Sequence, residues 1–213
     1  MNVILYGKAI DPATRQVILM LEEQKIPFKL DLLQTEAEGQ ISLTVGSDLR
    51  FFGSYAILEY LESTNVSLFG ETHQIKGNTR NFLQNCEQDL GYKITYPLVF
   101  EKITKFIKRL GTPDYILIKQ IEQSIPSALS EIDAYLKDQA YVVANHLTFA
   151  DLALAAHISC LDYLNNIKWK QFNGLYNWFL AIKSRPSFAT ILAETVLHIK
   201  PSKNYQLLDF EQQ

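Results

Sequence analysis

Thr148-Phe149-Ala150-Asp151-Leu152-Ala153-Leu154-Ala155-Ala156 carries the strongest structural signal in this chain of 213 residues. Thr148, with Asp151 three positions later, forms a pattern like a capping box, in which side chains satisfy free backbone N–H groups of the first helical turn. The residues that follow are apolar on every side of the expected helix. Because a helix without a polar face is buried among other helices, this segment predicts the central helix of a bundle.

Apolar residues before this segment recur every three or four positions, as on one face of a helix. They are Ile118, Ile121, Ile125, Leu129, Ile132 and Leu136. Pro126 lies inside this run, and we expect it to kink the helix. Residues 77–110 also look helical, with Pro97 expected to bend or break the run, and a further helix is expected near residues 172–184. No strand pattern follows the first part of the chain, which predicts an all-helical domain over residues 77–198.

The first 63 residues instead alternate strand and helix patterns. Strands are expected at residues 3–6, 27–33, 41–45 and 49–52, with the last two joined as a hairpin. Asp11-Pro12 predicts a helix start, because Asp is a preferred N-cap and Pro suits the first helical position. Ser54 is expected to cap the next helix, and a helix between the first two strands makes them parallel. We therefore expect an α/β domain over residues 1–63, a linker over residues 64–76 and a C-terminal tail over residues 199–213.

Composition argues against several classes of function. Hydrophobic residues make up 47% and charged residues 20%, so the chain can bury enough apolar surface to fold. Lys and Arg number 20 against 23 Asp and Glu, and this net charge of -3 argues against nucleic acid as a partner. Cys86, Cys160 and four scattered histidines show neither a disulfide framework nor metal-ligand spacing. Without a signal-like or membrane-spanning apolar run, we expect a reducing, cytoplasmic location and no membrane insertion.

Four parts of the chain resemble the glutathione S-transferase (GST) superfamily. They are Val3–Tyr6 with Arg15-Gln16-Val17 after it, residues 53–61 (GSYAILEYL, similar to the family's E-S-x-A-I-L-x-Y-L), residues 148–153 (TFADLA, similar to its capped core helix) and residues 185–188 (RPSF, similar to its R-P-x-F). The resemblance implies a thioredoxin-like α/β domain followed by an all-α helical domain, usually in a homodimer. It also implies a glutathione site on the first domain.

Three positions of that implied site depart from the family pattern. Ser42 stands where the resemblance implies a cis-proline, and Gly53 stands where it implies a Glu beside Ser54. A cis bond before a residue other than proline costs about 2.5–4 kcal/mol, so we expect Ser42 to be trans with an altered backbone edge. Asp11 stands where the resemblance implies a Ser or Cys, and a carboxylate repels a thiolate instead of donating to it. The substrate-binding positions that carry over are Ser42, Leu43, Gly53 and Ser54.

Two segments resemble a narrower group, the FtsZ-binding, GST-like bacterial division proteins. They are residues 11–17 (DPATRQV) and residues 205–210 (YQLLDF). This resemblance implies a homodimeric adaptor that binds FtsZ filaments without transferase activity or a cofactor, and in which Leu208, Asp209 and Phe210 contact a partner. The alternative is an active glutathione S-transferase that conjugates glutathione to small electrophiles and uses Tyr6 or Thr14 as its catalytic hydroxyl.

Structural roles compete with several of these functional ones. Asp11 and Ser54 also suit plain helix caps, and Tyr6 also suits packing between the two domains. His157 lies in the most apolar helix, and we expect a hydrogen-bonded core histidine instead of a ligand. The cations of residues 102–109 (KITKFIKR) form either a solvated helix face or a patch for an acidic partner. The tail docks either on its own domain or on a partner.

Overall fold

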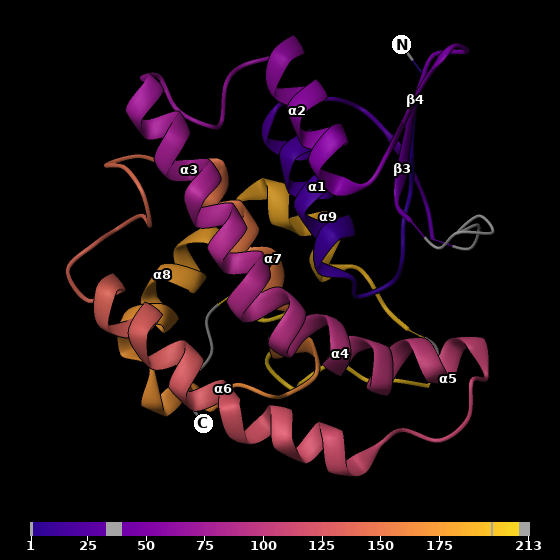
Figure 1. Cartoon of the computed structure of the whole chain (residues 1–213), viewed down its shortest axis with the longest axis vertical. Helices are drawn as coiled ribbons and strands as arrows, with labels where there is room; N and C mark the ends of the chain where they lie inside the picture. The colour runs from indigo at the N-terminus through magenta and orange to yellow at the C-terminus, as the bar shows by residue number, and fades with distance from the viewer. Residues whose placement is uncertain (1, 33–39, 197, 209–213) are drawn as a thin grey trace.

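The computed structural model describes residues 2–32, 40–196 and 198–208. A small sheet with two helices beside it lies next to a larger set of helices (Figure 1). This arrangement confirms the expected combination of an α/β region with an all-helical region. No helix among the described residues is long and apolar enough to cross a membrane.

Four short strands form a mixed sheet in the order β2-β1-β3-β4. They are β1 (Val3–Tyr6), β2 (Lys29–Asp31), β3 (Ser42–Val45) and β4 (Leu49–Phe52). As expected, β1 runs parallel to β2, and β3 pairs with β4 as an antiparallel hairpin. β2 starts later than the strand expected from residue 27, because Pro27 has no N–H to donate to a ladder.

Two helices pack beside this sheet. They are α1 (Pro12–Glu23) and α2 (Ser54–Thr64). Val3 and Leu5 are alternate residues of β1 and therefore share one face of the sheet. Together with Leu43 of β3 they belong to one core cluster with residues of α1 and α2. The expected cap by Ser54 is wrong, because Gly53 occupies the N-cap position with a φ of 80° and Ser54 is the first residue of α2. Glycine is the residue that adopts this φ readily, so position 53 determines where α2 begins.

Residues 73–108 form one continuous helical rod. Its parts are α3 (His73–Cys86), the π-helical segment η1 (Glu87–Thr95), α4 (Tyr96–Val99), the π-helical segment η2 (Phe100–Thr104) and α5 (Lys105–Lys108). The rod is not broken at Pro97, but it bends, since α3 and α5 run in different directions in Figure 1. Wide π-helical turns precede the proline, and the Thr95 hydroxyl donates to the Leu90 carbonyl at 3.1 Å. Pro97 lies in the first turn of α4, and helical backbone continues on both sides of it.

The connection between α2 and α3 is shorter than the expected linker. It covers residues 65–72 instead of residues 64–76. Thr72 caps α3, because its hydroxyl accepts from the Ile75 N–H at 3.2 Å. The helical region therefore begins at His73, four residues before the expected boundary.

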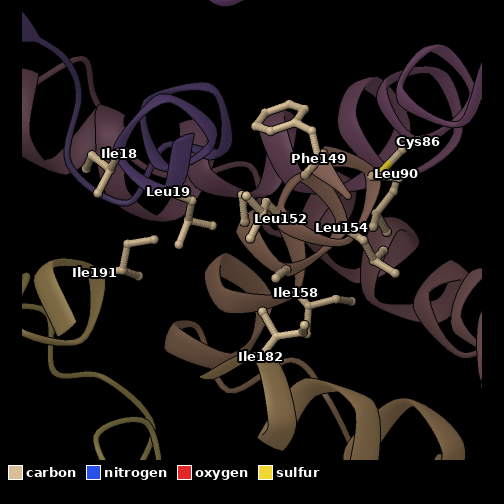
Figure 2. Close-up of a cluster of buried hydrophobic side chains, with 14 of the residues drawn as sticks. Ile18, Leu19, Cys86, Leu90, Phe149, Leu152, Leu154, Ile158, Ile182 and Ile191 are labelled. Carbon is tan, nitrogen blue, oxygen red and sulfur yellow. The ribbon is translucent and has the colours of Figure 1, made fainter. Parts of the chain in front are cut away.

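The helical region is completed by α7 (Phe149–Tyr163), which packs on α1, α3 and η1, and by five further helices among the described residues. They are α6 (Tyr115–Leu136), η3 (Trp169–Gln171), α8 (Asn173–Lys183), η4 (Pro186–Phe188) and α9 (Ala189–Leu192). Every residue of α7 is buried, and Figure 2 shows its apolar side chains between Leu19 of α1, Leu90 of η1 and Ile182 of α8. The expectation of a central helix is confirmed. α6 runs through Pro126 without interruption.

An ion pair ties α1 to the end of the helical region. Arg185 donates to the two carboxylate oxygens of Glu23 at 2.6 and 2.8 Å, and the Ser187 hydroxyl donates at 2.5 Å. Burial alone would raise the pKa of Glu23. The hydrogen bonds from Arg185 and Ser187, together with the charge of Arg185, instead hold this pKa below its ordinary value of 4.5.

We expect Glu23→Gln to lower the free energy of unfolding by about 1–2 kcal/mol at neutral pH, because charge-assisted hydrogen bonds are lost. A carboxyl group with a lowered pKa in the folded state stabilises the fold above its unfolded pKa, and this stabilisation disappears as the pH falls through the folded pKa. The difference between the native chain and the variant should therefore shrink below pH 4.5. Urea unfolding at neutral and acidic pH measures it, and an equal difference at both would contradict the assignment.

Candidate functional site

The positions that the resemblance assigns to glutathione lie at one end of the sheet. Cross-strand register places Tyr6 beside Ser42, and Ser42 beside Phe52. Gly53 and Ser54 follow directly, where β4 passes into α2. The structure therefore brings Tyr6, Ser42, Gly53 and Ser54 together at this end of the sheet.

The backbone around Ser42 is already part of the sheet. All peptide bonds of the described residues are trans, including the bond before Ser42. The Ile41 carbonyl accepts from the Gly53 N–H at 2.9 Å, and the side chains of Ser42 and Leu43 are buried. A tripeptide that binds through its backbone needs available N–H and C=O groups at such an edge. At this end of the sheet the Ile41 carbonyl already accepts one hydrogen bond, from the Gly53 N–H.

The turn between β1 and α1 uses its polar side chains internally. Asp11 is the N-cap of α1, and its Oδ2 accepts from the Thr14 N–H and from the Thr14 hydroxyl, each at 2.9 Å. The Thr14 Oγ1 in turn accepts from the Lys8 N–H at 3.0 Å. Burial raises the pKa of Asp11, although the hydrogen bonds from Thr14 and the charge of Lys8 act against the rise. Both side chains are buried, so neither is placed to activate a thiol.

The start of α2 keeps a hydroxyl but has no carboxylate. A Cβ at Gly53 would meet no atom within 4 Å, so open space lies where the resemblance implies a Glu side chain. The φ of 80° at this position would strain any side chain placed there. Ser54 is half-buried beside it, and no side chain caps the helix.

Tyr6 is half-buried at the end of β1. The Arg50 guanidinium lies 5.7 Å from the centre of its ring and 5.0 Å from the centre of the Phe52 ring. A cation at this distance interacts with the face of the ring and not with the hydroxyl group. Because Thr14 is committed to the α1 cap, an enzymatic reaction at this edge would depend on the Tyr6 hydroxyl.

A buried polar cluster lies between α1 and the helical region, around Glu87, a residue to which no motif pointed. Gln16 Nε2 donates to Glu87 Oε1 at 2.9 Å, and the Tyr96 hydroxyl donates to the same oxygen at 3.1 Å. His157 Nε2 lies 3.5 Å from that oxygen, and His157 Nδ1 lies 2.7 Å from Thr95 Oγ1. Burial would raise the pKa of Glu87, but its contacts with His157, Gln16 and Tyr96 lower it. The expectation of a hydrogen-bonded core histidine at position 157 is confirmed.

Comparison with known proteins shows which fold the chain shares. Residues 92–186 match the family model of the glutathione S-transferase C-terminal domain. FzlA from C. crescentus has a similar structure, with a TM-score of 0.91 at 28% identity over 99% of this chain and 100% of that one. The chain therefore has the fold of the glutathione S-transferase superfamily. Its α/β region and helical region are therefore the two parts of the GST fold.

Similar proteins include both an FtsZ-localized protein and glutathione S-transferases. FtsZ-localized protein A of Caulobacter vibrioides is 29% identical over 222 residues, with 97% of each chain covered. A glutathione S-transferase from Sinorhizobium meliloti has a TM-score of 0.92 at 27% identity, over 99% of this chain and 100% of that one. Glutathione S-transferase F9 of Arabidopsis thaliana is 26% identical, with 90% of each chain covered.

The C-terminal segment of this GST-fold chain packs on its own helical region as far as Tyr205. The Ser202 N–H donates to the Tyr163 carbonyl at 3.0 Å, and the fully buried Tyr205 donates its hydroxyl to the Ile191 carbonyl at 3.1 Å. Leu208 is exposed. Asp209 and Phe210 lie outside the described residues, so a partner contact at positions 208–210 stays a prediction.

The two cysteines are buried side chains. Burial raises the pKa of both thiols, and it raises that of Cys160 to about 12. Neither is therefore a ready nucleophile at neutral pH. In the part of the chain that the structure describes, no three His, Cys, Asp or Glu residues gather in a way that could hold a metal ion.

Proposed function

We propose that this chain is a GST-fold adaptor of bacterial cell division, which binds FtsZ filaments in the cytoplasm and has no transferase activity. The similarity to FtsZ-localized protein A over 97% of both chains carries this proposal. The internal hydrogen bonds of Asp11 and Thr14 support it, because they occupy the groups that would otherwise activate a thiol. A fold can keep its surface for binding after its chemistry is lost.

Three features of the sheet edge count against glutathione as the ligand. The peptide bond before Ser42 is trans, unlike the cis-proline bond that the resemblance implies, and Gly53 supplies no carboxylate. Asp11 places a carboxyl group where a thiolate would have to be stabilised, and like charges repel at short range. Each feature weakens a different part of tripeptide binding.

Co-sedimentation with FtsZ filaments tests the proposed adaptor role. We expect the chain to pellet with polymerised FtsZ at micromolar protein and to stay in the supernatant when FtsZ is kept unpolymerised. An active plant glutathione S-transferase of the same fold is the matched control and should remain in the supernatant. No co-sedimentation at micromolar concentration would remove the proposal.

An active glutathione S-transferase is the second candidate, because Tyr6 and Ser54 keep hydroxyl groups at the sheet edge. Calorimetry with millimolar glutathione separates the two functions. The adaptor proposal expects no heat of binding. Heat in the native chain that falls in Tyr6→Phe, together with turnover of an aryl halide, would favour the enzyme.

We also propose that the chain forms a homodimer. A groove of about 520 Å³ runs between α6 and the rod formed by α3 and η1, and Phe82, Leu90, Ile94 and Ile132 contribute to its apolar lining. Phe52, at the end of β4, is exposed. A self-complementary dimer needs an apolar anchor and a matching recess on the same subunit. Two copies of a filament contact would then raise the avidity for a repeating polymer.

Phe52→Ser tests this homodimer. If the ring is an anchor, its loss should weaken dimerisation by more than about tenfold, as for a central interface residue. Light scattering at micromolar concentration should then report the monomer mass of 24.4 kDa. Val66→Ser removes a more exposed apolar side chain elsewhere and should leave the mass at the dimer value. An unchanged dimer in Phe52→Ser would place the interface elsewhere.

A further inference from the structure

A large cleft opens at the same end of the sheet as the candidate site, beside the turn between β1 and α1. Its volume is about 870 Å³, which lies within the range of ligand sites. Ala9 and Leu32 of the N-terminal region form one wall, the end of the rod with Phe106 and Ile107 forms another, and Val196 of the C-terminal segment contributes a third. In Figure 1 the end of the rod, α5, lies at the lower right, below the strands.

The apolar surface of this cleft continues beyond its walls. Phe106, Ile107 and Leu110 are each half or more exposed. Tyr115 and Ile116, at the start of α6, are also exposed. An exposed apolar surface that extends along consecutive turns marks an interaction site for a macromolecule. A small molecule held in the cleft would leave most of this strip uncovered.

The charges at the cleft have one sign. Lys105 and Arg109 line it, and no Asp or Glu is found among the described residues that line it. Lys105 pairs with Glu101 at 2.6 Å, and Lys102, farther back on the rod, pairs with Glu122 at 2.7 Å. Lys108 and Arg109 form no ion pair with the described residues. Lys102 and Lys105 are therefore paired within the chain, whereas Arg109, which lines the cleft, and Lys108, next to it in the sequence, keep an unpaired positive charge.

We propose that this cleft docks an extended acidic peptide that carries large apolar side chains, supplied by a partner protein. The apolar walls would take the side chains, and Lys108 and Arg109 would pair with the carboxylates, so the charge complementarity selects an acidic occupant. The net charge of the whole chain is -3, so this local positive surface is not a property of the molecule at large. The inference goes beyond the proposed filament binding, since it concerns any partner with such a segment.

Fluorescence anisotropy with a labelled synthetic peptide tests the docking site. The probe is a twelve-residue peptide in which Asp and Glu alternate with Leu and Phe. Two control probes replace the acids by Asn and Gln, or the Leu and Phe by Ala. Arg109→Asn removes the charge and suits the φ of 53° at this position, because Asn tolerates left-handed backbone. Ile107→Ser removes an exposed apolar contact, and Lys170→Gln is the matched control, an exposed cation on η3.

We expect the acidic apolar peptide to bind the native chain and Lys170→Gln equally. Arg109→Asn and Ile107→Ser should each weaken binding by about threefold to tenfold, and a rise in ionic strength should weaken it further. Equal binding of the neutral probe, or of the acidic probe to all variants, would overturn the proposal. Sedimentation with anionic phosphatidylglycerol vesicles but no peptide binding would assign the surface to a membrane and would also overturn it.

Discussion

Replacement of Asp151 by alanine is expected to lower the free energy of unfolding by about 3–5 kcal/mol, because buried donors of Val142, Thr148 and Trp178 lose their acceptor. The carboxylate of Asp151 is fully buried. It accepts from the Val142 N–H at 2.9 Å, the Thr148 N–H at 3.0 Å and the Trp178 Nε1–H at 3.2 Å. A helix cap alone is worth about 1 kcal/mol. The larger value follows because this side chain also joins the preceding loop and α8 to α7.

Urea unfolding followed by circular dichroism measures this effect. Asp151→Asn is the matched control, since its amide oxygen still accepts one or two of these hydrogen bonds, and we expect a loss of only about 1–2 kcal/mol. Binding to filaments or peptides should fall only as far as the unfolded fraction grows. Equal stability of the Ala and Asn variants would show that the buried donors find other acceptors.

The parts of the fold that the sequence predicted correctly have local signals. Thr148 and Asp151 lie three residues apart, and the apolar helix after them needs no distant information. The rod and the start of α2 were harder to predict. Pro97 indicated a bend or a break, and the π-helical turns that precede it are not visible in residue preferences. Ser54 looked like a cap by its residue type, but the φ of Gly53 depends on the path from β4 into α2.

The candidate site shows the same division between local and distant information. The capping geometry of Asp11 could be read from Asp-Pro, because its partner Thr14 is three residues away. Glu87 had one available signal, since it follows Leu83 by four residues and precedes Leu90 by three on the buried face of the rod. A charge at such a position indicates a buried partner. Its partner Gln16 is 71 residues away, and no local pattern identifies such a pair.

A second large effect is expected for Glu194→Gln, which should lower the free energy of unfolding by about 3–5 kcal/mol. Arg15 is fully buried, and its Nη2 and Nε lie 2.8 and 3.1 Å from Glu194 Oε2. Its Nη1 donates to the Ser159 hydroxyl at 2.8 Å, and Tyr205 faces the guanidinium at 5.7 Å. Removal of the carboxylate charge leaves a buried cation without a counter-ion, which costs more than the pair contributes.

A double-mutant cycle with Arg15→Met separates the pair from its surroundings. Replacing both partners of a buried ion pair costs little stability, because no charge is then left buried without a counter-ion. We therefore expect the double variant to be more stable than the sum of the single variants predicts, by about 2–3 kcal/mol. Arg15 belongs to α1 and Glu194 follows α9, so a coupling of this size makes the C-terminal segment part of the cooperative unit that contains the sheet. A coupling below about 0.5 kcal/mol would instead mean that Tyr205 and its hydrogen bonds hold the segment in place.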